Sequence, residues 1–219
     1  MAVVTGLNRP KGIFSGIECS TRIPWDERFA TDPGKIIMVS GPSGVGKTTL
    51  IRNFIASQPE TASATVSETT RGPRKSDLLG EYRHWSREEF LRLGEKAWEI
   101  FAHGQYYATL THSFRLSLLM PGVHLLNCIP LIPENLPAQF LLCQRVIPFF
   151  IVAPPEPVLR RRFAERGDNL KIVEERLSDC RGWNEWAENS HIGFHKIDGA
   201  LGKAQMLEVF TREVGRLVR

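Results

Sequence analysis

Short apolar runs alternate along this chain with segments whose apolar residues recur at helical spacing. The runs that we expect to form buried parallel strands are residues 36–39, 123–129 and 146–153. Helical spacing marks residues 48–56, 157–166 and 170–186, and a last helix places one apolar stripe at Leu207, Phe210, Val214 and Leu217. Strands that alternate with helices predict an α/β fold, in which helices flank a parallel sheet.

Two regions depart from this alternation. Residues 64–85 are polar and rich in turn residues, and their alternating stretches favour short antiparallel strands. Ser86 and Glu89 then form a capping box of the S-x-x-E type, which opens a helix. Residues 1–34 show no periodicity, so we expect an N-terminal extension in front of a domain at residues 35–219.

The composition is that of an ordinary globular protein. With 219 residues, 42% of them hydrophobic and 24% charged, the chain can bury a core without disulfide bonds or structural metal ions. This composition excludes disordered, collagen and coiled-coil proteins. No uncharged apolar run approaches the ~18 residues of a membrane span, so we expect no membrane partner. The first residues lack a long apolar segment, and we expect no cleaved signal peptide.

Cysteine spacing and net charge indicate the cellular compartment and the kind of binding partner. The 4 cysteines lie far apart without C-x-x-C spacing, which favours reduced thiols in a cytoplasmic protein. The formal charge is +4, but the arginines sit in motifs instead of a basic tail. We therefore expect small phosphorylated molecules as partners, and not nucleic acid; the oligomeric state stays open.

Residues 41–48, GPSGVGKT, match the phosphate-binding loop G-x-x-x-x-G-K-[ST] in full. Glycines let successive backbone N–H groups point at an anion, and the N-terminus of the following helix faces the same phosphates. Lys47 is suited to the β and γ phosphates, and the Thr48 hydroxyl to Mg²⁺. An accidental glycine-rich turn is the alternative, but the preceding strand and following helix favour the functional one. The expected ATP-binding residues are Gly41, Ser43, Gly44, Val45, Gly46, Lys47, Thr48 and Thr49.

A second candidate phosphate site follows at residues 67–74, SETTRGPR, and at Tyr82. Two arginines around a proline suit bidentate phosphate contacts, although a solvated basic loop is the alternative. Together with the phosphate loop, this block resembles guanylate kinase, whose pattern S-x-T-T-R-x-P-R it matches. The resemblance implies that the GMP phosphate is bound by Ser67, Arg71, Arg74 and Tyr82.

The resemblance continues at Glu99 and at residues 103–109, HGQYYAT, which are similar to the family's E-(spacer)-H-G-N-Y-Y-G-T. It implies that Glu99 and Thr109 contact guanine and that Tyr107 contacts the phosphate. A carboxylate can accept both N1–H and the 2-amino group of guanine, which adenine does not offer in that arrangement. The alternative is an ordinary surface glutamate at position 99.

A third block, with Pro154, Arg162, Arg166 and Arg176, is similar to the family's lid. The resemblance implies that the three arginines act in catalysis by neutralising phosphate charge; the alternative is a solvated helix face paired with Glu165, Glu174 and Glu175. The resemblance also implies a P-loop NTPase core, an inserted nucleoside-monophosphate-binding lobe near residues 67–107 and a helical lid near residues 158–190.

The chain also departs from the family pattern. Residues 126–130, LNCIP, carry no Asp where the family has an acidic L-D-x-D segment, and Glu134 is a candidate replacement. Spacings before Tyr82 and His103 are one residue short. We expect MgATP-dependent phosphorylation of GMP, with Lys47 as a further catalytic residue. A related kinase for another nucleotide or sugar phosphate, and a non-catalytic binding module of the same fold, stay open as alternatives.

Overall fold

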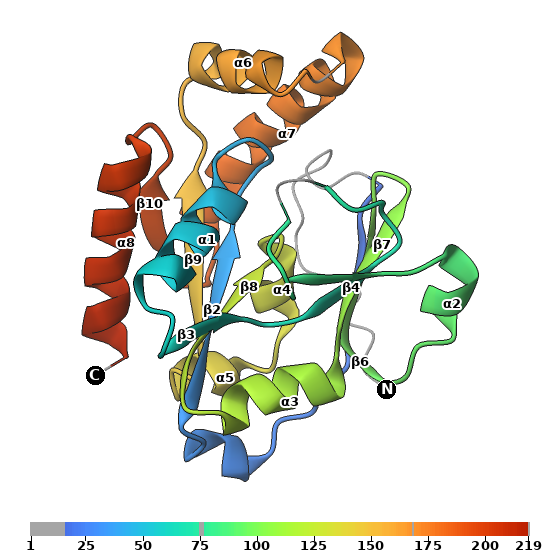
Figure 1. The fold of residues 1–219 in the computed structure, drawn as a ribbon, viewed down its shortest axis with the longest axis vertical. Helices are drawn as coiled ribbons and strands as arrows, with labels where there is room; N and C mark the ends of the chain where they lie inside the picture. The colour runs from blue at the N-terminus through green and yellow to red at the C-terminus, as the bar shows by residue number, and fades with distance from the viewer. Residues whose placement is uncertain (1–15, 75–76, 168, 219) are drawn as a thin grey trace.

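The computed structural model describes residues 16–74, 77–167 and 169–218, and within them the strands form two five-stranded sheets (Figure 1). The core sheet has the strand order β10-β9-β2-β8-β3, and every neighbouring pair in it is parallel. Its strands are β2 (Gly34–Ser40), β3 (Ala62–Ala64), β8 (Gly122–Asn127), β9 (Val146–Val152) and β10 (His195–Asp198). The predicted α/β fold with a helix-flanked parallel sheet is confirmed.

Alternate residues of β2 supply the two faces of the core sheet, because successive side chains of a strand point to opposite sides. Ile37 and Val39 pack with α1 (Lys47–Ser57) and α8 (Lys203–Leu217). Ile36 and Met38 pack into a second cluster, to which α3, α4, α5 and α7 contribute. The bounds of the three short helices are α3 Thr111–Leu119, α4 Leu131–Asn135 and α5 Ala138–Leu142. Both faces are therefore covered, which explains why these strands read as continuous apolar runs.

The lobe sheet has the order β1-β6-β7-β4-β5. Its strands are β1 (Glu18–Thr21), β4 (Ser67–Thr69), β5 (Tyr82–His84), β6 (Lys96–Ala102) and β7 (Gln105–Leu110). The expectation of antiparallel strands within residues 64–85 is wrong, because β4 and β5 pair in parallel. The antiparallel partner of β4 is β7, which lies outside that segment. Between β5 and β6, α2 (Arg87–Leu91) begins at the predicted capping box, in which both reciprocal hydrogen bonds between Ser86 and Glu89 are present.

The expected N-terminal extension is corrected by the structure. Residues 1–15 lie outside the described residues, but from Ile17 onward the chain is part of the fold. Strand β1 pairs antiparallel with β6, and Ile17, Ile23 and Phe29 are buried in the core cluster. This segment lacks periodicity because it consists of one short strand and a 3₁₀ turn at Glu27–Ala30, each too short to show a repeat.

Two helices form an arm that projects beside the phosphate loop, at the top of Figure 1. They are α6 (Glu156–Glu165) and α7 (Leu170–Asn189), and they share a small apolar cluster that includes Leu159, Phe163 and Leu177. Farther along α7, Trp183 and Trp186 join the main core cluster, which anchors the helix. All four cysteines are free thiols. Among the described helices, none is long and apolar enough to cross a bilayer.

Candidate functional site

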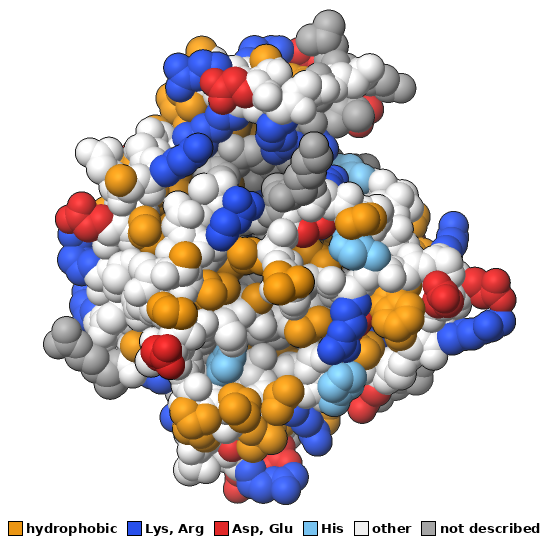
Figure 2. Space-filling view, viewed as in Figure 1, with side chains coloured by type: hydrophobic (Ala, Val, Ile, Leu, Met, Phe, Trp, Pro, Cys, Tyr) orange, Lys and Arg blue, Asp and Glu red, His pale blue; other side chains and the backbone are white. Residues whose placement is uncertain are grey.

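A cleft of about 1050 Å³ lies where the phosphate loop, the lobe sheet and the two arm helices meet. In Figure 2, basic side chains gather along the arm and at the edge of the hollow beneath it. The cleft is lined from all three sides, by residues 43–49 of the loop, by Arg71, Arg74, Tyr82 and Tyr107 of the lobe, and by Arg162, Arg166 and Arg176 of the arm. Motifs that are separated in sequence therefore face one space.

The phosphate loop takes a backbone path that requires glycine. Gly44 has φ +83°, and a Cβ there would lie 2.7 Å from Cε1 of Phe163. Gly41 has φ +134°, and a Cβ there would lie 2.5 Å from the carbonyl oxygen of Ile151. The turn therefore packs directly against β9 and α6. It leads into the first turn of α1, and the N-terminus of a helix is a place where backbone N–H groups bind anions.

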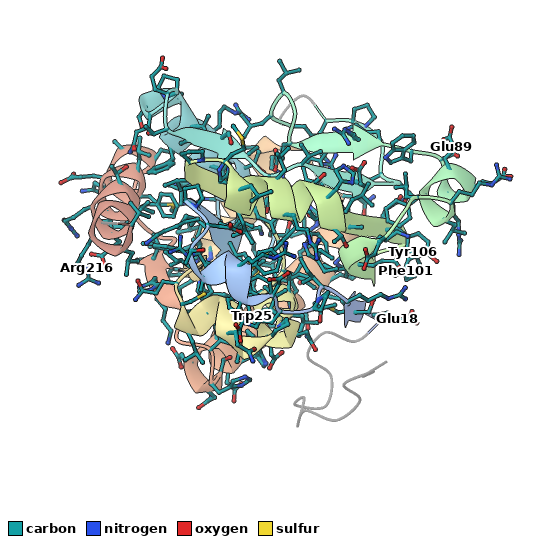
Figure 3. All side chains as sticks on the ribbon, turned by 90° about the horizontal axis from the view of Figure 1, so that it is seen from below. Glu18, Trp25, Glu89, Phe101, Tyr106 and Arg216 are labelled. Atoms are coloured by element: carbon teal, nitrogen blue, oxygen red, sulfur yellow. The ribbon has the colours of Figure 1, made fainter. Side chains whose placement is uncertain are left out.

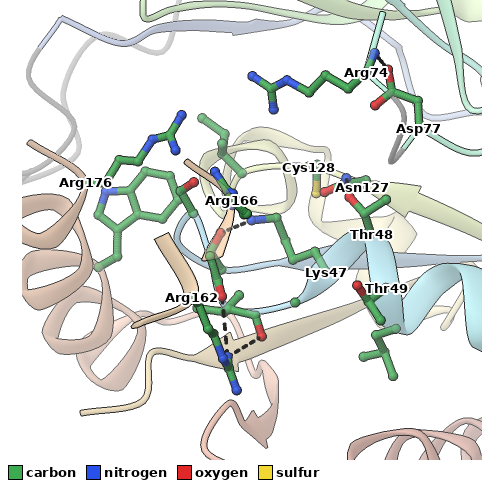
Figure 4. Close-up of a pocket in the computed structure, with 18 of the residues that line it drawn as sticks. Lys47, Thr48, Thr49, Arg74, Asp77, Asn127, Cys128, Arg162, Arg166 and Arg176 are labelled. Atoms are coloured by element: carbon green, nitrogen blue, oxygen red, sulfur yellow. Dashed lines mark hydrogen bonds between the residues drawn. The ribbon is translucent and has the colours of Figure 1, made fainter. Parts of the chain in front are cut away.

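Lys47 lies at the start of α1, and its ammonium group turns back into the loop. Nζ donates hydrogen bonds to the carbonyl oxygens of Gly41 at 2.5 Å and Pro42 at 2.9 Å (Figure 4). Burial lowers the pKa of Lys47 to about 8, since removing an ammonium from water disfavours its charged form. Burial likewise raises the pKa of the neighbouring Cys128 thiol, so that this group stays neutral. A bound phosphate would give the ammonium the countercharge that the described residues do not supply here.

A polar bridge connects Thr48 with the lobe. The side-chain amide of Asn127, at the end of β8, donates to Thr48 Oγ1 at 3.3 Å and to Glu81 Oε1 at 3.1 Å. Glu81 is 3% exposed and also accepts a hydrogen bond from the Leu78 backbone. No sequence motif singled out Glu81, and Glu134, the carboxylate expected to replace the acidic segment, lines a separate cavity instead.

The donor set of this bridge suits Mg²⁺. A hydroxyl, an amide and a carboxylate are all oxygen ligands of the kind that magnesium prefers. The described residues contain no group of three or more His, Cys, Asp or Glu side chains that could hold a metal alone. This agrees with the usual way in which magnesium is bound, through substrate phosphates, water and one or two protein groups.

The lobe contributes a cationic and aromatic cluster to the cleft. Arg71 is 8% exposed and donates to both oxygens of Asp77, at 2.9 and 2.7 Å, while its guanidinium carbon lies 4.6 Å from the centre of the Tyr82 ring. Burial raises the pKa of Tyr82 and of Tyr107, so both phenols remain hydrogen-bond donors. Asp77 also accepts from the Arg74 backbone at 2.8 Å, which leaves the Arg74 side chain directed into the cleft (Figure 4).

Three residues expected at the acceptor site do not line the cleft. Ser67 and Thr109 are buried, and their hydroxyl groups lie 3.2 Å apart in hydrogen-bond contact with each other. Glu99 lies on β6 but is paired with Lys96 at 3.2 Å on the opposite face of the lobe sheet. The expectation that Glu99 contacts the acceptor is therefore corrected by the register of β6 in this structure.

The three arm arginines differ in what they contact. Arg162 donates to the carbonyl oxygens of Gly44, Val45 and Gly199, at 3.4, 3.3 and 3.0 Å, so it fastens the arm to the phosphate loop. Arg166 and Arg176 line the cleft, and both guanidinium groups lie over the Phe163 ring, at 5.4 and 5.7 Å. The expected carboxylate partners lie elsewhere, since Glu174 pairs with Arg160 at 2.6 Å and Glu165 with Arg161 at 3.8 Å.

A phosphate loop, a second arginine-lined phosphate site and a cationic helical arm around one cleft define a phosphotransferase of the P-loop class. The family model for guanylate kinase matches residues 33–182. The guanylate kinase of Anaplasma phagocytophilum (strain HZ) is 34% identical over 149 residues, which cover 66% of this chain and 70% of that protein. The guanylate kinase of Alkalilimnicola ehrlichii (strain ATCC BAA-1101 / DSM 17681 / MLHE-1) is 32% identical over 199 residues, or 85% of this chain and 93% of that protein.

A solved structure agrees with these sequence comparisons. The crystal structure of guanylate kinase from Anaplasma phagocytophilum superimposes with a TM-score of 0.55 at 25% sequence identity, covering 85% of each chain. The chain belongs to the guanylate kinase family. It is accordingly a phosphotransferase of the nucleoside monophosphate kinase type, and its relatives support ATP-dependent phosphorylation of GMP.

Proposed function

We propose that this protein transfers the γ-phosphoryl group of MgATP to the phosphate of GMP, giving ADP and GDP. The observation that carries the proposal is the arrangement of two phosphate sites in one cleft, with Lys47 on one side and Arg71 and Arg74 on the other. Two polyanions brought together repel each other, and a cleft lined by cations from three elements offsets that repulsion. ATP and GMP are the proposed small-molecule partners, and the cytoplasm is the proposed location.

The mechanism needs positioning and charge neutralisation more than covalent chemistry. The attacking oxygen of the GMP phosphate is already anionic at neutral pH, so no general base is required. Lys47 would hold the β and γ phosphates, while Arg166 and Arg176 would neutralise the transferring group. Arg162, whose donors contact backbone carbonyl groups, is assigned to positioning the loop. Arg71, Arg74, Tyr82 and Tyr107 would hold the acceptor phosphate in line.

Magnesium is the proposed cofactor, and bound together with ATP it would supply positive charge to the phosphate groups. Thr48 would contribute its hydroxyl group to the ion. Asn127 and Glu81 would not contact the ion but would orient the group that does. Asn127 is hydrogen-bonded to both the Thr48 hydroxyl and the Glu81 carboxylate. This bridge would take over the task of the acidic segment that residues 126–130 lack.

The test is ADP release by the purified chain with MgATP and, in turn, GMP, dGMP, AMP, CMP, UMP and ribose 5-phosphate. The proposal expects release with GMP and its loss in Lys47→Met, with the circular dichroism spectrum unchanged. Near-normal turnover by Lys47→Met, or no ADP release with GMP, contradicts it. Binding of ATP and GMP without any turnover would favour a non-catalytic module.

A further inference from the structure

The face of the lobe sheet on which Glu99 lies is settled by strand register. In the antiparallel pair β6 and β7, Glu99 is opposite Ala108 and Phe101 is opposite Tyr106, so these side chains share one face. The Phe101 and Tyr106 rings lie 4.7 Å apart, and Figure 3 shows the two residues close together. Tyr106 also stacks on Phe90 of α2 at 5.3 Å. Glu99 therefore lies on the α2 side of the sheet, away from the cleft.

The opposite face of β6 forms the cleft wall, and it is apolar. Trp98, Ile100 and Ala102 line the cleft and are 2%, 3% and 5% exposed. The only polar side-chain atom of the three residues is Trp98 Nε1, which is buried and has no hydrogen-bond partner among the described residues. An indole nitrogen only donates, and the guanine edge formed by N1–H and the 2-amino group also only donates. These three side chains therefore offer guanine no acceptor.

The carboxylates that do line the cleft have other partners. Asp77 accepts from Arg71 and from the Arg74 backbone, and Glu165 lies on α6 beside Arg161. The buried Glu81 accepts from Asn127 and from the Leu78 backbone. No described carboxylate is thus left at the lobe wall to read a base. The phosphate cluster remains, since Arg71, Arg74, Tyr82 and Tyr107 all line the cleft.

We propose that the acceptor site selects the phosphate group and not the base, so that its substrate class is phosphomonoesters more broadly. The inference rests on the proposed function and extends its acceptor range. GMP, IMP (which lacks the 2-amino group) and ribose 5-phosphate (which lacks the base) all place a phosphate in the Arg71 and Arg74 cluster. The remainder of each acceptor lies against the wall formed by Trp98, Ile100 and Ala102, where apolar contacts do not distinguish one base from another.

The test is calorimetric binding of GMP, IMP and ribose 5-phosphate to the full chain, in the absence of ATP. We expect dissociation constants within about 10-fold of one another, whereas a site that reads a hydrogen-bonding edge discriminates by about 10⁴ or more. Glu99→Gln should leave GMP binding within about 2-fold, and Arg74→Ala should weaken all three ligands by a similar factor of about 10.

Several outcomes overturn the inference. One is a preference for GMP over IMP of more than about 100-fold. Another is a Glu99→Gln variant that loses GMP binding but keeps ribose 5-phosphate binding, and a third is no binding of any of the three ligands. Equal binding without ADP release from MgATP and GMP would refute the proposed function and leave the inference standing. Phosphorylation of GMP with rejection of IMP would do the reverse.

Discussion

The partly buried ammonium group of Lys47 should make ATP binding pH-dependent between pH 7 and 9, where ATP itself titrates little. Its pKa is lowered from 10.5 to about 8. At 1.36 kcal/mol per unit, burial therefore destabilises the charged form of this group by roughly 3 kcal/mol in the free protein. The protonated fraction of a group with that pKa is about 90% at pH 7 and about 10% at pH 9. Since only the ammonium form attracts phosphate, the apparent dissociation constant for ATP should rise about 10-fold over this interval.

Isothermal titration calorimetry at pH 7, 8 and 9, in two buffers with different heats of ionisation, measures both the affinity and the protons taken up. The γ-phosphate, with a pKa of about 6, is already about 90% ionised at pH 7, so its own titration changes the affinity little above that pH. At pH 8 we expect uptake of about half a proton per ATP bound. Lys47→Arg, which stays charged, is the matched control and should show neither effect. Equal ATP affinity at pH 7 and 9, or no proton uptake, would refute the reasoning.

The same shift has a consequence for stability, whose sign follows from proton counting. Between pH 8 and 10.5 the unfolded chain keeps a proton on Lys47 that the folded chain has released. The free energy of unfolding should therefore rise with pH in this window, relative to Lys47→Arg. Urea unfolding of both proteins at pH 8 and pH 10 measures the difference, and a fall relative to the control would contradict the shift.

Three further predictions concern other parts of the site and the lobe. Arg71→Ala should raise KM for GMP by about 10-fold or more and leave KM for ATP within about 2-fold; equal changes would remove Arg71 from the acceptor site. Gly44→Ala should lower the free energy of unfolding by about 1–3 kcal/mol in urea titrations, because its φ is +83° and the new Cβ would meet Phe163; an unchanged midpoint contradicts this. Ser86→Ala should cost about 1 kcal/mol by loss of the helix cap that it forms with Glu89, with kcat unchanged; an unaltered unfolding midpoint would contradict the capping role.

The parts of the fold that the sequence predicted are those with local signals. The four consecutive apolar residues at 36–39 are typical of a strand that is covered on both faces of a sheet, and β2 is buried on both faces. Ser86 and Glu89 interact within one helical turn, so their spacing alone specifies the cap. The lining of the cleft by Lys47, Arg71 and Arg74 was predicted because each lies in a motif with a distinct chemical pattern.

The parts that were missed depend on pairings between distant residues. Strand β1 is stabilised by β6, about 80 positions away in the sequence, and no pattern within its four residues predicts that pairing. The orientation of Glu99 depends on a register irregularity between Lys96 and Trp98, and a slip of one residue transfers every later side chain to the other face of a strand. Glu81 could not be found from the sequence because its contact with Asn127 joins residues 46 positions apart.

The pairing of β1 with β6 also restricts how the lobe can move. A lobe inserted at one point of a chain is joined to the core by two neighbouring segments, one entering the lobe and one leaving it. Together these two segments allow the lobe to rotate about a single axis. Here the chain passes between lobe and core a third time, between β1 and β2, and Thr21 of β1 is hydrogen-bonded to the backbone of Asn135 in the core. Any rotation of the lobe must bend three connections at once. The acceptor half of the cleft is therefore more restrained against rotation than a lobe held by two connections would be.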